Sequence, residues 1–559
     1  MPTLALLTLL WACKDSPEDS ATPWQPEVFC PGGPQECPNN DGPLRAAAAA
    51  IDITPDCFEQ WTDLDGSGDY SASRDSFEDC GCDRLCPEDE GYPGPDSGES
   101  DGTFQPIWMA GFGNGRAAQG VHDPLWARVI VLDQGETRLA VVAVDLVGFF
   151  NTDVKRVRDA MPAELEIDQL IINSTHTHEG PDSMGLWGQR IGLRGVNEDY
   201  MAEVRQRIID GVAEATGRLE EVQSLTVGRT FPADQHERGQ ANVMRDSRDP
   251  IVITDEVGAA ILRNATGDTI ATLVNWGSHP ETLASENTLI SSDFVEPLRR
   301  TVEEGSSWEA YQRPGLGGTC VYLQGMVGGM MTPLGISVHD PDGNVWTDAS
   351  FEKANALGQL IGEMALDAAE GGEVAVDPKL SFASMKVRLP VDNISFQAMF
   401  RLGVFERDLL GYDPDEDIDE ENKPEVETEV GVVRLGPIGI LTIPGELLPE
   451  VAIGGYDGSK VGTDLYTLID PNNVAPPDLS QAPAGPYLRE QIGSDHGWIL
   501  GLANDELGYI IPAYDFVTDP EVPYLTEAEG DHYEETNSLG PQTEPLLSGA
   551  AAQLLGWSP

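Results

Sequence analysis

Residues 170–181 read LIINSTHTHEGP and join a short apolar run to a polar segment that carries two histidines. The apolar part is typical of a buried β-strand, and the Gly-Pro pair marks its end. Because side chains alternate between the two faces of a strand, a strand that continues into the polar part places His176 and His178 on the same side. In α/β sheets, ligands bind in the loops that follow the carboxyl ends of strands. The stretch therefore predicts a strand that leads into a pocket holding both imidazoles.

His279 is a third histidine in a similar position. It ends the strand-like run TIATLVNWGSH at 269–279, so it is also expected at the end of a strand. A His-x-His pair alone has two interpretations, metal ligands or hydrogen-bonded structural groups. A third converging histidine favours metal, because a catalytic zinc takes about three protein ligands and keeps one position for water. The residues alone thus predict a histidine-rich metal site in an enzyme.

Strand-like and helix-like segments alternate along most of the chain. Apolar runs typical of strands read RVIVLDQ at 128–134, LAVVAVDLV at 139–147 and CVYLQG at 320–325. Helical periodicity is found at 198–216 and 350–369. We therefore predict an α/β fold.

The composition excludes one class of partner. The chain of 559 residues carries 33 Lys and Arg against 95 Asp and Glu, a formal net charge of −62. Such a surface repels phosphates, so nucleic acid is not an expected partner. A hydrophobic content of 40% is that of a packed globule, and the length suits one elaborated domain or two.

The amino terminus, MPTLALLTLLWAC, contains an apolar run that is too short to span a bilayer and fits a signal peptide. We predict a signal peptide at 1–12 and, because LWAC resembles a lipobox, a lipidated Cys13 that attaches the mature chain to a membrane surface. Residues 13–43 are rich in Pro, Asp, Glu and Asn and predict a tether without structure of its own. The protein is therefore expected to be exported, either as an outer-membrane or cell-surface lipoprotein or in secreted form.

Six cysteines precede the main fold, and they are Cys30, Cys37, Cys57, Cys80, Cys82 and Cys86. In an exported, loop-rich segment this clustering predicts disulfides. We expect the first two to pair with each other and the other four to form two disulfides, whose connectivity stays open. A zinc knuckle on the last three is the alternative, although Cys-x-Cys-x3-Cys is not a common structural zinc pattern. Cys320, inside the main fold, is expected to be unpaired and buried.

The acidic, cysteine-rich stretch 57–103 is predicted to be an insertion in a single catalytic domain at 44–559. Within the insertion, DLDGSGD at 63–69 places oxygen-bearing side chains at alternate positions and Gly at the sixth, as an EF-hand calcium loop requires. The candidate Ca²⁺ ligands are Asp63, Asp65, Ser67 and Asp69. The twelfth position holds Arg74 where such loops carry Glu, so an ordinary acidic turn is the alternative.

The histidine stretch resembles the THTHSGPGG-type signature of the neutral ceramidases, zinc enzymes that hydrolyse the amide between sphingosine and a fatty acid. Similar segments follow in the same order, and they read AGFGNGRAAQGVHDPLWAR, VVAVDL, ANVMRDSRDP, VNWGSHPETL, TIPGE, GLANDELGYIIP and HYEETNSLGP. They cover about 45–555 apart from the insertion. The resemblance implies a mixed-sheet neutral-ceramidase-like catalytic domain, without the immunoglobulin-like carboxyl-terminal domain that the family usually carries.

Carried onto this sequence, the resemblance implies a zinc site made by His176, His279, Glu446 and Tyr509. It implies that His178 lies beside the metal and polarises the scissile carbonyl. The same resemblance points to Arg245 and Thr332 as further site residues. Arg245 is a candidate for stabilising the oxyanion, with a surface ion pair to a neighbouring Asp as the alternative.

Thr332 stands where the family has a Ser before Pro, and it is expected to contact the substrate with an added methyl group. The predicted activity is zinc-dependent hydrolysis of the amide of ceramide or a related N-acyl lipid by an activated water. A metal hydrolase of the same fold that cleaves another amide or an ester is one alternative. A surface lipoprotein that binds its ligand without turnover is the other.

Overall fold

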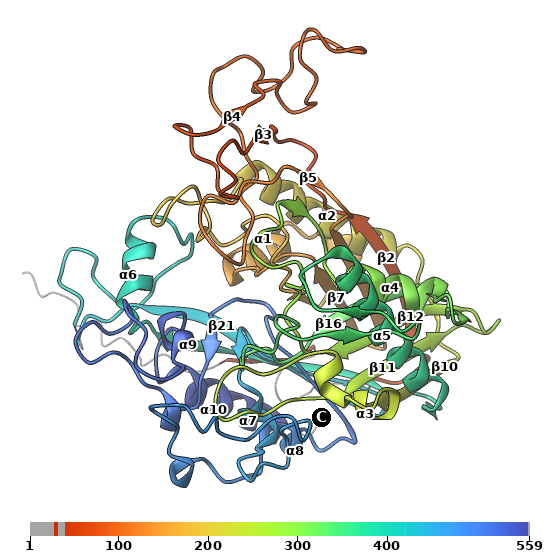
Figure 1. The fold of residues 1–559 in the computed structure, drawn as a ribbon. Helices are drawn as coiled ribbons and strands as arrows, with labels where there is room; N and C mark the ends of the chain where they lie inside the picture. Colours follow the sequence, from red (N-terminus) through yellow and green to blue (C-terminus); the bar gives the residue numbers. More distant parts are fainter. Residues whose placement is uncertain (1–26, 32–39, 420, 557–559) are drawn as a thin grey trace, which may run out of the picture.

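The computed structural model describes residues 27–31, 40–419 and 421–556. Three five-stranded sheets dominate this part of the chain (Figure 1). The first has the order β8 (Gln169–Ser174), β7 (Thr137–Val144), β6 (Trp126–Gln134), β2 (Arg45–Asp52) and β9 (Glu220–Glu221). The second has the order β16 (Thr319–Gln324), β12 (Thr269–Trp276), β11 (Val257–Arg263), β10 (Ser224–Thr230) and β19 (Glu373–Ala375). The third has the order β24 (His496–Leu500), β22 (Ile438–Thr442), β21 (Glu425–Leu435), β20 (Leu380–Pro390) and β1 (Val28–Phe29).

The three sheets share the same arrangement of strands. In each sheet, three consecutive long strands form an antiparallel meander, and a fourth strand lies parallel to the last of them. A short strand pairs antiparallel with the first strand of the meander. A helix that follows the parallel strand then packs on the first two strands: α2 (Glu198–Thr216), α5 (Phe351–Glu370) and α10 (Thr543–Leu555).

The connection to each parallel strand is helical, as parallel pairing requires a crossover. It contains α1 (Asn151–Ala160) in the first sheet, α4 (Val295–Glu304) in the second, and α7 (Pro449–Ile453) and α8 (Leu488–Ile492) in the third. Parallel strands carry their carboxyl ends to the same edge. Each sheet therefore presents two strand ends, with their loops, at one edge.

The sheets are buried on both faces. In β6, Val129 and Val131 face the cluster that contains α2, whereas Ile130 and Leu132 face a second cluster shared by strands of all three sheets. A strand buried on both faces is read as a continuous apolar run, which is why RVIVLDQ lacks polar alternation. The α/β class and mixed sheets are confirmed, and helix α2 has the predicted bounds.

The insertion projects from the body of the molecule, at the top of Figure 1, and carries β3 (Trp61–Thr62) and β4 (Ser76–Phe77). Its four cysteines form the disulfides Cys57–Cys82 and Cys80–Cys86, which confirms the predicted pairing and excludes the zinc knuckle. Cys320 is free and buried, as expected. Cys37, the expected partner of Cys30, lies outside the described residues.

The calcium-loop segment gathers a different set of oxygens from the predicted one. Carboxylates of Asp63, Asp65 and Asp75 approach one another within 4.8 Å. The Ser67 hydroxyl donates to the backbone oxygen of Asp69 instead of joining that group. Arg74 forms a 2.6 Å ion pair with Asp65. The unexpected residue at the twelfth position thus already neutralises one candidate ligand, and the calcium site stays a prediction.

Packed structure begins earlier than the predicted tether boundary at residue 43. Strand β1 pairs with β20. Asn40 is buried, and its amide donates to Thr137. Residues 1–26, with the predicted signal peptide and Cys13, lie outside the described residues. Among the helices that the structure describes, none has the length and apolar character needed to cross a membrane.

Candidate metal centre

Three histidines from two sheets meet at the strand ends. A ring nitrogen of each of His176, His178 and His279 lies within 4.8 Å of the others, a geometry that can hold a metal ion. Their ring centroids are 4.8–5.5 Å apart. All three side chains are buried, so the cluster is built into the core of the fold.

The histidine pair is placed by a turn and not by strand alternation, contrary to the prediction. Strand β8 ends at Ser174, and His176 has a φ of 68°, in the left-handed region that non-glycine residues seldom adopt. The two imidazoles face one space because the backbone bends between them. Such conformations concentrate at functional sites, where the surrounding structure holds them in place.

Two rings are held through Nδ1. Nδ1 of His176 lies 2.5 Å from the carbonyl oxygen of Val147, and Nδ1 of His279 lies 2.9 Å from that of Met331. A carbonyl oxygen only accepts, so both Nδ1 atoms carry the proton. When either ring is neutral, its lone pair therefore lies on Nε2. This backbone-held tautomer is the one in which histidines bind metals.

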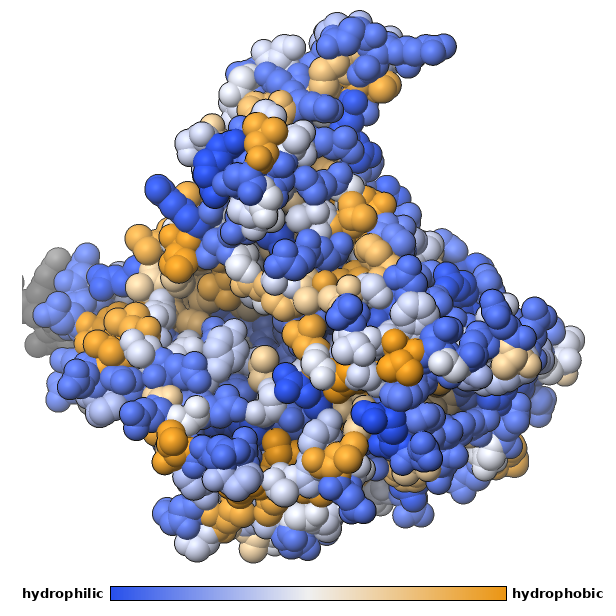
Figure 2. Space-filling model, viewed as in Figure 1, coloured by the Kyte–Doolittle hydropathy of each residue, from blue (hydrophilic) through white to orange (hydrophobic). Residues whose placement is uncertain are grey.

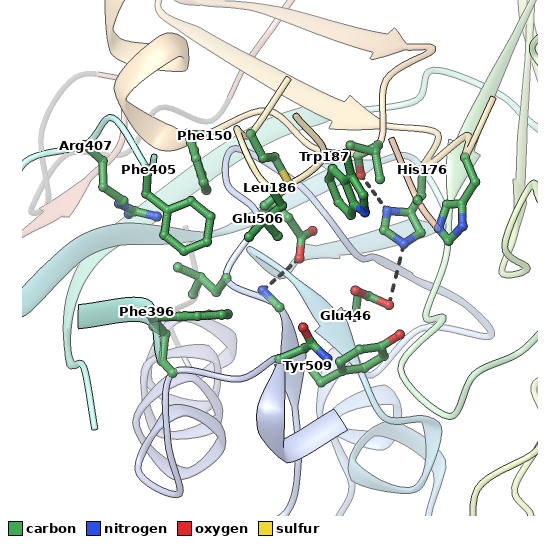
Figure 3. Close-up of a pocket in the computed structure, with 18 of the residues that line it drawn as sticks. Phe150, His176, Leu186, Trp187, Phe396, Phe405, Arg407, Glu446, Glu506 and Tyr509 are labelled. Carbon is green, nitrogen blue, oxygen red and sulfur yellow. Dashed lines mark hydrogen bonds and ion pairs between the residues drawn. The ribbon is translucent and has the colours of Figure 1, made fainter. Parts of the chain in front are cut away.

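Glu446 lies opposite the two Nε2 atoms. Its Oε2 is 3.2 Å from Nε2 of His279 and 3.6 Å from Nε2 of His176. Glu446 begins β23 (Glu446–Leu447), which pairs in parallel with β25 (Tyr509–Ile510), so that Glu446 and Tyr509 are direct register partners. That pairing brings the third sheet's two strand-end loops together at the histidines (Figure 3).

The charges of the cluster favour an ionised carboxylate. Burial opposes it, but the neighbouring His176 and His279 lower the pKa of Glu446. Burial lowers the pKa of His176 to about 3. For His279 burial acts in the same direction, but Glu446 and Glu281 outweigh it and raise its pKa to about 9. Burial and Glu446 raise the pKa of Tyr509 well above its usual range. The carboxylates thus make the cluster receptive to positive charge.

His178 is positioned from two sides. Gly111 has a φ of 101°, and a Cβ there would lie 2.4 Å from the Cβ and Cγ of His178, so only glycine fits. On the other side, Nδ1 of His178 is 3.3 Å from Oε2 of Glu281. Glu281 was not assigned a role from the sequence, although it lies two residues after His279. A carboxylate that close to a metal-site histidine is a usual orienting partner.

Thr332 is not among the residues that line the pocket of His176 and His178, and the expected substrate contact stays a prediction. Its hydroxyl donates to Glu281 and accepts the backbone N–H of Leu334 at 2.9 Å. Thr332 is 2% exposed. It is therefore linked to His178 through Glu281.

Arg245 does not line the pocket of His176 and His178. Its backbone pairs with that of Thr332, but its side chain lines a separate polar pocket together with Asp246, Asp249 and Tyr466. The side chain thus lies in a different pocket from His176 and His178, and the oxyanion role stays a prediction.

A buried amide ties the histidine-bearing loops together. The side chain of Gln324, at the end of β16, donates to the backbone oxygens of Thr175 and Ser278 at 2.7 and 2.8 Å. Its backbone N–H donates to Asn173. One fully buried residue thus fixes the segments that precede His176 and His279.

An apolar pocket opens onto the metal-site residues. His176, His178, Glu446 and Tyr509 share it with Arg407 and Glu506. The apolar side chains that line it are Val147, Phe150, Met184, Leu186, Trp187, Phe396, Phe400, Phe405, Leu507 and Leu539. Phe396 and Phe400 come from α6 (Ile394–Arg401). Figure 2 shows a hollow below the projecting insertion, with apolar residues beside it.

Comparison with known proteins identifies the fold of this chain. No family model and no curated protein sequence matches the chain. The crystal structure of neutral ceramidase from Pseudomonas aeruginosa superimposes with a TM-score of 0.57 at 15% identity, covering 92% of this chain and 75% of that one. A ceramidase complexed with C2 superimposes with a TM-score of 0.57 at 14% identity and the same coverage. The chain therefore has a neutral-ceramidase-like fold.

Proposed function

We propose that this protein is a zinc-dependent amidohydrolase that cleaves the amide of ceramide or a related N-acyl lipid. The observation that carries the proposal is the convergence of three buried histidines and Glu446 where an apolar pocket meets the strand ends. The likeness of the fold to neutral ceramidase supports the same reaction class.

The donor set fits zinc. His176 and His279 offer Nε2 lone pairs, and Glu446 offers a carboxylate oxygen 3.2 and 3.6 Å from them. In a tetrahedral site with bonds of about 2.0–2.1 Å, neighbouring ligand atoms are about 3.3 Å apart, which these distances approach. We assign Tyr509 as the fourth ligand, as the resemblance implies. His178 is assigned to the substrate side of the cluster.

When bound, zinc would polarise the amide carbonyl and lower the pKa of a water molecule. Side chains of the protein supply the stabilisation of the oxyanion and the transfer of a proton. Glu281, whose Oε2 lies 3.3 Å from Nδ1 of His178, orients that ring beside the carbonyl oxygen, where a ring N–H would stabilise the negative charge that develops there. The same pair can pass a proton to the departing nitrogen. Thr332 keeps Glu281 in place.

The pocket supports a lipid substrate. Its lining is dominated by aromatic and aliphatic side chains, and these favour hydrocarbon over water. We propose that an alkyl chain lies along Phe150, Phe396 and Phe405 with the amide at the histidines.

We further propose that the protein works outside the cytoplasm and is attached to a membrane surface through Cys13. The disulfides Cys57–Cys82 and Cys80–Cys86 support export, since such bonds persist in oxidising compartments.

A substrate panel tests the function. Zinc-loaded protein is incubated with ceramide, N-acyl ethanolamine, an N-acyl amino acid and an ester of matched chain length, and released fatty acid is quantified by mass spectrometry. Release from the N-acyl lipids, lost in His176→Ala, is the expected result. Cleavage of the ester alone would support the alternative hydrolase, and binding without any release would support the non-catalytic module.

A further inference from the structure

Glu506 is a carboxyl group inside the apolar pocket that has no role in the proposed zinc site. It is 3% exposed. Its Oε1 accepts the backbone N–H of Gly508 at 2.7 Å. Its Oε2 is fully buried and has no hydrogen-bond partner among the described residues. A buried acceptor left unsatisfied costs stability, so a polar group of a ligand is the natural partner.

The position of Glu506 suits substrate recognition. In Figure 3 it lies between the aromatic side chains Phe150 and Phe405 and the metal-site residue His176. A substrate whose chain lies on the aromatic residues and whose amide lies at the histidines must pass this carboxyl group.

The fold makes room for the side chain at this point. A Cβ on Gly148 would lie 2.8 Å from the Cβ and Cγ of Glu506. Gly148 directly follows Val147, whose carbonyl oxygen holds His176. The same short loop therefore positions the metal-site histidine and accommodates Glu506.

Among the described residues that line the pocket, no Lys or Arg side chain pairs with the Glu506 carboxyl group. Arg407 also lines the pocket, but its Nη1 and Nη2 are bound by Asp505 at 2.9 and 2.8 Å. Burial, with Glu446 adding to the effect, raises the pKa of Glu506 well above its usual range. A protonated carboxyl group can both donate a hydrogen bond to a hydroxyl group and accept one from it.

We infer that Glu506 binds a hydroxyl group of the substrate close to the scissile amide. This inference rests on the proposed function and narrows it: the preferred substrates are N-acyl amino alcohols, or amides of 2-hydroxy fatty acids, over amides that lack a hydroxyl group. The shared chemistry is the hydroxyl group, and its place on the amine half or the acyl half is resolved by the test.

Three synthetic amides provide the test: N-dodecanoyl-ethanolamine, N-dodecanoyl-ethylamine, and the ethylamide of 2-hydroxydodecanoic acid. For the zinc-loaded wild type we expect kcat/KM for one hydroxylated amide to exceed that for the plain ethylamide about ten- to a hundredfold, as for one buried hydrogen bond to a carboxyl group. Equilibrium binding of the same amides to the protein gives a second readout that does not depend on turnover.

Variants assign the preference to Glu506. In Glu506→Leu the ratio between the hydroxylated and the plain amide should fall toward one, with zinc content retained. Glu506→Gln keeps a donor and an acceptor and should preserve most of the ratio. Leu539→Ala, an apolar lining variant, is the control and should weaken all three amides together.

The outcomes separate the two claims. If no amide is cleaved while zinc is bound, the proposed function fails, and the binding ratio alone then decides the role of Glu506. If the wild type shows no preference in turnover or in binding, the inference is overturned. It is equally overturned if Glu506→Leu keeps the wild-type ratio.

Discussion

Thr332→Val tests the contact that links the loop after β16 to His178. Valine has nearly the shape of threonine but removes the hydroxyl that donates to Glu281 and accepts the N–H of Leu334. Both Thr332 and Glu281 are buried, so water does not replace the bond. The loss of a hydrogen bond to a charged group costs about 1.5–3 kcal/mol. Because Glu281 orients His178, we expect kcat/KM to fall about ten- to a hundredfold.

Thr332→Ser is the matched control, because it keeps the hydroxyl and loses one buried methyl group, worth about 1 kcal/mol. We expect serine to retain near-normal kcat/KM and the same substrate profile, since Thr332 reaches the site only through Glu281. The assay is steady-state hydrolysis on two N-acyl lipids, with zinc content and thermal unfolding measured on the same samples. Wild-type turnover in Thr332→Val would refute the relay, and a changed substrate profile in Thr332→Ser would restore a direct substrate contact.

Three further predictions follow from particular residues. Gly111→Ala places a Cβ against the ring of His178 and should lower kcat/KM by about a hundredfold or more, as for loss of a group that stabilises the oxyanion. Gly113→Ala is the control and should leave kcat/KM unchanged, because the space around Gly113 is open; equal effects of the two variants would refute the steric argument. Burial raises the pKa of Glu450 to about 8 and that of Glu534 to about 7. Between about pH 5 and 8 the folded state therefore holds protons that the unfolded chain has released, and the free energy of unfolding falls as pH rises. Glu450→Gln should reduce the fall of the melting temperature between pH 6 and 9, and an unchanged slope would contradict this. Cys320 should react with a maleimide only after unfolding, while a non-reducing peptide map gives Cys57–Cys82 and Cys80–Cys86; rapid labelling of the folded protein would be the contrary result.

Strands and helices could be predicted because their patterns are local. The apolar run at 128–134 is buried on both faces, and the segment at 198–216 has both a periodic apolar face and an Asn197 cap. The threefold use of one sheet plan was not visible, since the connections between matching strands differ in length and no repeat has a fixed period. Disulfide connectivity also needed the structure.

The site residues also fall into two groups, those that a local sequence pattern predicts and those that depend on the fold. His176 and His279 could be found because each follows an apolar strand, whereas the left-handed turn at His176 has no sequence signal. Glu281 and Glu506 were missed because their roles depend on what the fold places beside them: His178 for one, and an apolar pocket for the other. The side chain of Arg245 could not be placed from the sequence for the same reason, since its backbone adjoins Thr332 while its side chain lines another pocket.

Metal content and amide hydrolysis measured together on the wild type and His279→Ala test the central claim most directly. The wild type should contain about one zinc per chain and cleave ceramide or a related N-acyl lipid; chelation should abolish the cleavage, and added zinc should restore it. His279→Ala removes a nitrogen 3.2 Å from Glu446 and should lose both zinc and turnover. Undiminished hydrolysis in the chelated wild type or in zinc-free His279→Ala would contradict the account.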